Sequence, residues 1–216
     1  MTLKQRYDGV ISWFAANNPD ADTELNFSNP FEIVVAVILS AQCTDKRVNM
    51  VTPALYRRYP TPQAMAESSA EEILTYISSV SYPNSKAHHL HLMARKLVEE
   101  YGGEVPADFD ALLSLPGVGR KTANVVLSVA FGENRMAVDT HVFRVANRIG
   151  LTRDSKTPLH TEQTLVRHIP EHLLGRAHHW LILHGRYICT ARKPKCDRCG
   201  IAGYCRHFAA ASPSAT

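Results

Sequence analysis

The stretch Phe31-Glu-Ile-Val-Val-Ala-Val-Ile-Leu39 decides the fold class of this 216-residue chain. Its β-branched residues are typical of a buried strand, but no other segment of the sequence offers a partner strand. We therefore predict a central helix that is apolar on all sides. The longest apolar run, Ile33–Leu39, is too short to span a membrane.

The segments around this stretch have helical periodicity or helix-capping residues. Lys4–Ala16 places Tyr7, Val10, Ile11 and Phe14 on one face of a helix. Further helices are expected over Asp45 (or Thr44) to about Tyr59, Glu71–Ser79 (after Ser68 and Ser69), Ser85–Tyr101, Asp108–Ser114, Arg120–Phe131, Val138–Ile149 and Thr157-Pro158 to about Ile169. This many helices and no convincing strand predict an all-α fold. The tail after Phe208, residues 209–216, is expected to be disordered.

The composition is that of a globular protein and excludes a disordered polymer. The chain is 45% hydrophobic and 20% charged, which is enough to build a core in one large domain or two small ones. The first residues, MTLKQRYDGV, lack the order of a signal peptide, so we expect a reducing compartment, the cytoplasm. Disulfides are therefore a poor explanation for the five cysteines. The net charge of +4 permits nucleic-acid binding without requiring it.

Four of the cysteines lie close together near the C-terminus, in the pattern C-x6-C-x2-C-x5-C formed by Cys189, Cys196, Cys199 and Cys205. Thiolates are soft ligands, so such a group in a reducing compartment indicates a metal site. Both structural zinc and a 4Fe–4S cluster accept four cysteines, and the residue types alone leave both open. The fifth, Cys43, is interpreted as a core or pocket-wall residue.

Positive charge is concentrated over the same segment. Between Arg186 and Arg206 the cations are Arg186, Arg192, Lys193, Lys195, Arg198 and Arg206, and the single acid is Asp197. A basic stripe is often only a solvated face. Its interleaving with four cysteines favours a functional surface instead.

A second motif, Leu115-Pro-Gly-Val-Gly-Arg-Lys-Thr-Ala123, lies between two predicted helices. Gly117 and Gly119 permit a tight turn, and the second helix then begins with N–H groups that can bind a phosphate. The alternative is a plain turn between two helices. The pattern favours a helix–hairpin–helix, which holds the DNA backbone without reading its sequence.

Lys121 falls in the first turn of the second helix of this motif. Most helical lysines are solvated cations. The positive end of a helix dipole and the neighbouring Arg120 both disfavour the ammonium form, however, and a nucleophile must be the free amine. We therefore predict that Lys121 is a catalytic nucleophile.

Asp139 lies in Ala137-Val-Asp-Thr-His141, at the start of another predicted helix. The simplest role for an aspartate there is that of an N-cap. A carboxylate at this place can also accept a proton or stabilise a cationic sugar in the transition state. The two roles are compatible, and we predict both.

Taken together, the hairpin, VDTH (138–141) and the four-cysteine loop resemble the endonuclease III family along nearly the whole chain. Further matching stretches are LSAQCTD (39–45), NSKA (84–87) and HHWLILHGRYIC (178–189). The resemblance implies a bifunctional DNA glycosylase and abasic-site lyase with a 4Fe–4S cluster, acting on oxidised pyrimidines in double-stranded DNA. It also implies a six-helix domain (about 21–134) and a cluster domain (1–20 with 135–216) that flank a DNA-binding cleft. We expect a monomer associated with the nucleoid.

The same resemblance implies roles for individual residues. The expected DNA contacts are Gln42, Tyr82, Gly117, Gly119, Arg120, Arg186, Arg192, Lys193 and Lys195, and the expected pocket residues are Asp45 and His141. Gln42 matches the family residue that fills the gap left by the flipped nucleotide. Tyr82 stands where many relatives carry an aliphatic residue, and its ring can stack on the orphan base.

Two other functions compete with this interpretation. An adenine glycosylase of the same superfamily shares the hairpin, the aspartate and the cysteine loop, but typically lacks a lysine at the position of Lys121. A non-catalytic DNA-binding module needs neither Lys121 nor Asp139. The presence of both residues favours the glycosylase and lyase.

Overall fold

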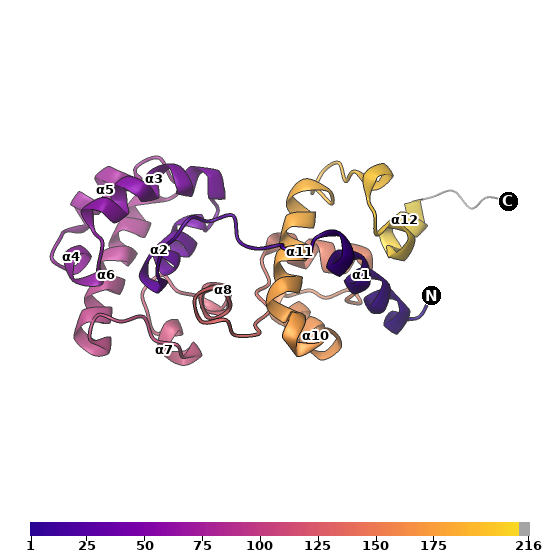
Figure 1. Cartoon of the computed structure of the whole chain (residues 1–216). Coiled ribbons are helices and arrows are strands. Elements are labelled where there is room, and N and C mark those ends of the chain that lie inside the picture. Colours follow the sequence, from indigo (N-terminus) through magenta and orange to yellow (C-terminus); the bar gives the residue numbers. More distant parts are fainter. Residues whose placement is uncertain (212–216) are drawn as a thin grey trace. The chain divides into compact units, whose positions relative to one another are not determined.

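The structure of the chain is a computed structural model that describes residues 1–211, and every regular element in that range is a helix (Figure 1). This confirms the predicted all-α fold. The chain divides into two compact units, Thr23–Glu133 and Met1–Asp22 together with the chain from Asn134 onward. The resemblance implied units of about 21–134 and of 1–20 with 135–216. No helix among the described residues is long and apolar enough to cross a membrane.

The unit Thr23–Glu133 contains seven helices, all in the described range. They are α2 (Pro30–Ser40), α3 (Asp45–Arg58), α4 (Pro62–Ala66), α5 (Ala70–Ile77), α6 (Pro83–Tyr101), α7 (Phe109–Leu113) and α8 (Arg120–Phe131). The sequence predicted six. The additional helix is α4, which begins with Thr61 as N-cap and Pro62 in the first turn.

The apolar stretch Phe31–Leu39 forms the centre of this unit as helix α2, as predicted. Asn29 caps the helix by accepting from the Glu32 N–H at 2.9 Å, and Pro30 occupies its first turn. Every residue from Ile33 to Leu39 is buried, because α2 packs against α3, α6 and α8. Burial on all sides explains why this helix has no polar face.

The other unit is built around α9 (Thr140–Ile149), which packs against α10 (Pro158–His168), α11 (Leu174–Tyr187) and α12 (Arg206–Ala211). Helix α1 (Leu3–Asn17) contributes Tyr7, Val10 and Phe14 to the same core. The ring of Phe14 stacks on that of Trp180 with 5.8 Å between centroids. Helix α12 includes residues 209–211, for which disorder was expected; three alanines are strong helix formers. The expectation for 212–216 lies outside the described residues.

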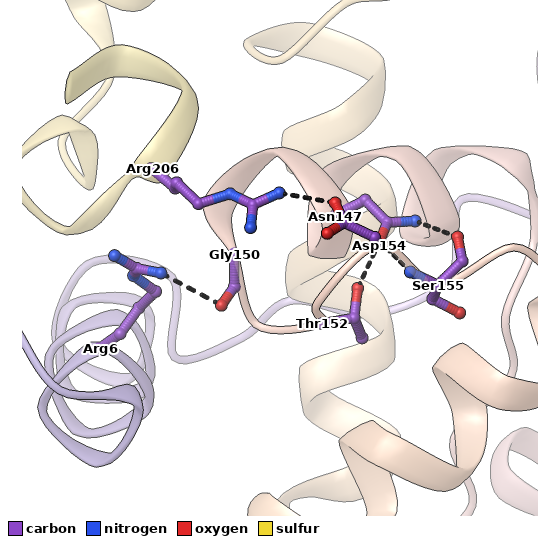
Figure 2. Close-up of polar contacts among 7 residues, drawn as sticks. All are labelled: Arg6, Asn147, Gly150, Thr152, Asp154, Ser155 and Arg206. Atoms are coloured by element: carbon purple, nitrogen blue, oxygen red, sulfur yellow. Dashed lines mark hydrogen bonds and ion pairs between the residues drawn. The ribbon is translucent and has the colours of Figure 1, made fainter. Parts of the chain in front are cut away.

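The loop that follows α9 makes polar contacts with the first helix, α1, and with the last, α12, of the described residues (Figure 2). In the last turn of α9, the side-chain oxygen of Asn147 accepts from the Thr152 hydroxyl at 2.7 Å and from the Ser155 N–H at 3.1 Å, both in the loop. From α1, Arg6 donates to the Gly150 carbonyl at 3.2 Å. From α12, Arg206 pairs with Asp154 at 3.0 Å. These contacts hold the C-terminal end of α9 in place, and with it the Asp139 N-cap at the other end.

Candidate functional site

The predicted hairpin joins α7 to α8. Its two apolar side chains, Leu115 and Val118, are buried, and the Val118 N–H closes the turn by donating to the Leu115 carbonyl at 3.0 Å. Gly117 lies between them with a φ of +81°, and a β-carbon there would lie 3.0 Å from Cβ of His89. The tight turn therefore requires glycine at this position.

Gly119 has a different role from Gly117. It is the N-cap of α8, its φ of −100° is open to any residue, and no heavy atom of the described residues lies within 4 Å of a β-carbon built on it. It also has no side chain that could accept from the first-turn N–H groups. The start of α8 is thus open on the side where a β-carbon would project, as a phosphate-binding turn requires.

Lys121 is the second residue of α8 and is partly buried. Beside it in the sequence, the guanidinium of Arg120 lies over the ring of Phe109, 5.1 Å from its centroid, and this contact joins α8 to α7. The predicted nucleophile therefore stands in the first turn of a helix that begins at an uncapped glycine.

Asp139 is the N-cap of α9, as predicted. Its Oδ1 accepts from the backbone N–H groups of His141 and Val142, both at 2.8 Å. Neither bond uses Oδ2, and among the described residues that oxygen accepts no hydrogen bond. One oxygen therefore holds the carboxylate in position while the other remains available for chemistry.

The two expected pocket residues belong to different units. Asp45 is the first residue of α3, where Thr44 is the N-cap, and it is partly buried. His141 lies in the first turn of α9, and its Nδ1 is 3.2 Å from Nη2 of Arg144. That contact fixes the imidazole ring beside Asp139.

All four predicted ligands, Cys189, Cys196, Cys199 and Cys205, line one pocket with about 350 Å³ of empty space, part of it open to solvent. Its other walls are largely apolar, and include Ile149, Ile188, Ile201 and Phe208. No group of three or more His, Cys, Asp or Glu among the described residues is arranged to hold a single metal ion. The observation that supports a bound cofactor is therefore the pocket itself, which is lined by all four cysteines.

The electrostatics of this pocket suit a cationic metal group. Burial, together with Cys205 and Cys189, raises the pKa of the Cys196 thiol, and burial raises that of Cys199. Four thiolates side by side repel one another unless a metal neutralises them. Burial lowers the pKa of His184 to about 4, and its Nε2 lies 3.6 Å from Cys199 Sγ, so a neutral ring borders the pocket.

The basic side chains of the cysteine loop are oriented outward. Arg192, Lys193 and Lys195 are exposed, whereas Arg186, on α11, is partly buried. An exposed cluster of cations around a rigid loop can bind the phosphates of a nucleic acid.

The structure brings together the two residues expected to enter the duplex. Gln42 follows α2 and Tyr82 precedes α6, yet the Ser81 hydroxyl donates to the Gln42 carbonyl at 2.7 Å. Both have left-handed backbones, with φ values of 52° and 54°. Among the described residues only one other non-glycine residue, Asp154, has a positive φ. The Tyr82 side chain is 65% exposed.

Sequence reasoning missed three cationic residues that hold these segments. Arg144 donates to the carbonyls of Cys189 (3.2 Å) and Gly185 (2.8 Å). Arg148 contacts the Cys189 sulfur, and Lys86 is buried at the end of α2. In the sequence, the spacing of four residues between Arg144 and Arg148 indicates only that both side chains lie on the same face of a helix.

Comparisons with known proteins agree with this geometry. Residues 35–171 match the HhH-GPD superfamily of base excision DNA repair proteins, and residues 189–205 match the iron–sulfur binding domain of endonuclease III. The chain is 53% identical to endonuclease III of Rickettsia conorii, over 92% of this chain and 94% of the relative. It is 49% identical to endonuclease III of Escherichia coli, over 92% and 93%.

A solved structure described as a trapped endonuclease III–DNA covalent intermediate has a TM-score of 0.93 and 44% identity, and the match covers 97% of this chain and 99% of that one. The iron–sulfur match decides between the two cofactors that the cysteines left open, and the cofactor is a 4Fe–4S cluster. The chain therefore belongs to the endonuclease III family, the DNA glycosylases and abasic-site lyases of base excision repair.

Proposed function

We propose that the chain removes oxidised pyrimidines from duplex DNA and then cleaves the strand at the resulting abasic site, with Lys121 as the nucleophile. The observation that carries this proposal is the position of Lys121, second in α8, behind a hairpin that leaves the helix start open at Gly119. The amine is thereby held next to a site for the DNA backbone. The covalent DNA intermediate described for a relative gives further support.

The reaction begins with extrusion of the damaged nucleotide, which costs a few kcal/mol and less for a damaged pair. The Lys121 amine attacks C1′ of the sugar, the C1′–N bond breaks, and its electron pair leaves with the base, which takes up a proton. Ring opening produces a protonated Schiff base between Lys121 and C1′. Loss of a proton from C2′ then expels the 3′ phosphate by β-elimination, and water hydrolyses the Schiff base.

Asp139 is the acid–base partner in this scheme. Its Oδ1 is held by two N–H groups, and Oδ2 is available to stabilise the cationic sugar and to accept protons. We assign Asp45 and His141 to the damaged-base pocket. His141 is supported in this role by the contact of its ring with Arg144.

DNA binding is assigned to three groups of residues. The hairpin contact to the DNA backbone is made by Gly117, Gly119 and Arg120. Other phosphates are contacted by Arg186, Arg192, Lys193 and Lys195. The duplex is entered by Gln42, which fills the gap, and by Tyr82, which stacks on the orphan base. The cluster bound by the four cysteines organises the basic loop. We further propose that the protein acts as a monomer in the cytoplasm, at the nucleoid.

Borohydride trapping on DNA that contains thymine glycol tests the nucleophile. The unmodified protein should form a covalent adduct and Lys121→Ala should not. Lys4 is a matched control, because it is also the second residue of its helix, and Lys4→Ala should behave as the unmodified protein. Normal cleavage by Lys121→Ala would refute the mechanism. If the protein instead released adenine paired with 8-oxoguanine faster than it released thymine glycol, it would be an adenine glycosylase.

A further inference from the structure

Lys86, in the first turns of α6, is a buried lysine with a defined set of acceptors. Its side chain is only 5% exposed, and its Nζ donates to the backbone carbonyls of Leu39 at 2.8 Å and Ala41 at 2.7 Å. Lysine is rarely buried without such partners. Burial lowers the pKa of Lys86, an effect that the neighbouring Cys43 partly opposes.

The two acceptors lie where α2 ends. The last carbonyls of a helix have no partner within the helix and carry the negative end of its dipole, so an ammonium group is a favourable cap. Directly after this cap the chain turns through Gln42, whose left-handed φ of 52° is costly for a residue with a side chain. Such a conformation persists only where the surroundings hold it.

The helix that carries Lys86 begins at the second turn, which contains Tyr82. The Lys86 backbone N–H donates to the Tyr82 carbonyl at 3.2 Å, the first hydrogen bond of α6. Tyr82 is likewise left-handed and provides no side-chain cap for that helix. Between the two turns, the Ser81 hydroxyl donates to the Gln42 carbonyl at 2.7 Å. Lys86 and Ser81 thus connect two strained, exposed turns that are forty residues apart in the sequence.

We propose that Lys86 and Ser81 are positioning residues that hold Gln42 and Tyr82 at a fixed spacing for entry into the duplex. This inference rests on the DNA contacts assigned to Gln42 and Tyr82 under the proposed function. Neither Lys86 nor Ser81 needs to contact DNA. A pair of side chains that is already ordered loses less conformational entropy on insertion, so less of the binding free energy is spent on ordering.

The test compares two DNA substrates under single-turnover conditions. One is a duplex with thymine glycol, in which a base pair must be opened and its gap filled. The other is a single strand with a preformed abasic site, which needs Lys121 but no gap-filling residue. The variants are Lys86→Met, Ser81→Ala and Ser81→Thr. Lys96→Met, on the same helix, partly exposed and paired with Glu100, is the matched control.

Lys86→Met loses two charge-assisted hydrogen bonds, and its duplex rate should fall by roughly ten- to a hundredfold or more. Ser81→Ala loses one neutral hydrogen bond, and its duplex rate should fall by about fivefold. Both variants should cleave the single strand within about twofold of the unmodified protein. Ser81→Thr keeps the hydroxyl and should retain the duplex rate, as should Lys96→Met. Equal losses on both substrates, or no loss on the duplex, would overturn the proposal.

Two further variants separate this inference from the function on which it rests. If Gln42→Ala and Tyr82→Ala show no duplex-specific loss, the assigned DNA contacts are wrong. If they show it and the Ser81 and Lys86 variants do not, only the positioning role is wrong. Should Lys86→Met fail to fold, judged by its urea unfolding midpoint, the contrast between Ser81→Ala and Ser81→Thr decides.

Discussion

The guanidinium of Arg148 contacts a proposed cluster ligand directly, with Nη1 3.7 Å from the sulfur of Cys189. The same side chain donates to the carbonyls of Thr190 and Ala191, both at 2.7 Å. One residue of α9 therefore holds the first ligand of the loop and the two residues that follow it.

Replacement of Arg148 by methionine should therefore loosen the cluster loop. Three hydrogen bonds from a charged donor are lost, each of which contributes about 1.5–3 kcal/mol at most. We expect the visible absorbance of the cluster to decay several-fold faster in the presence of an iron chelator. Arg176→Met, at an exposed position on α11, is the control. Equal decay rates for the two variants would show that Arg148 does not support the cluster.

The N-cap role and the chemical role of Asp139 can be separated by Asp139→Asn. Asparagine caps a helix as well as aspartate, so the free energy of unfolding should change by less than about 0.5 kcal/mol. The carboxylate is lost, and the single-turnover rate of base release should fall by about a hundredfold or more. Asp139→Ala should lose the same activity and about 1 kcal/mol of stability as well. An active Asp139→Asn enzyme would rule out the acid–base role.

The two hairpin glycines should respond differently to alanine. Gly117→Ala places a side chain on a φ of +81° and close to His89, so stability should fall by about 1–2 kcal/mol in urea unfolding. Gly119→Ala meets no described atom and has an ordinary φ, so stability should change by only a few tenths of a kcal/mol. Its methyl group would nevertheless stand where a phosphate approaches, and DNA affinity should weaken several-fold. Unchanged affinity would remove Gly119 from the DNA interface.

The exposed cations of the cysteine loop should contribute to the salt dependence of DNA binding. For the triple variant Arg192→Gln, Lys193→Gln, Lys195→Gln, the slope of log Kd against log salt should decrease by about 0.9 for each phosphate contact that is lost. Titration between about 50 and 200 mM salt measures it. Arg95→Gln, an exposed residue paired with Glu99 on α6, serves as the control. If the slope of the triple variant is unchanged, these three cations do not contact DNA phosphates.

Alkaline pH should destabilise the protein through Tyr7. Burial raises the pKa of Tyr7 above its ordinary value of 10.0, and its hydroxyl donates to the Leu151 carbonyl at 2.8 Å. The stabilising contribution is complete below pH 10 and is lost above it, because the unfolded chain ionises first. Tyr7→Phe should cost about 1 kcal/mol at pH 8. Between pH 8 and pH 11 the tyrosine should lose about 1.4 kcal/mol relative to the phenylalanine variant, so the difference should vanish or reverse its sign in urea unfolding at pH 11. A difference independent of pH would contradict the assigned pKa shift.

Local patterns in the sequence were sufficient for most of the helices and for the local geometry of several candidate positions. Helix α2 follows from an apolar stretch without a partner strand, and the roles of Gly117 and Asp139 follow from turn and capping preferences that act over a few residues. The four cysteines are recognisable because ligands on one loop are close in the sequence.

Only the tertiary structure decided which distant side chains support these positions. Lys86 and Leu39 are separated by 47 residues and Arg148 and Cys189 by 41, yet both pairs are in direct contact. Apart from its place in the family-matching stretch NSKA (84–87), nothing in the local pattern distinguishes Lys86 from the exposed lysines of the chain. Its role arises because the packing of α6 on α2 buries the ammonium group at a helix end, where the carbonyls of Leu39 and Ala41 compensate for the lost water.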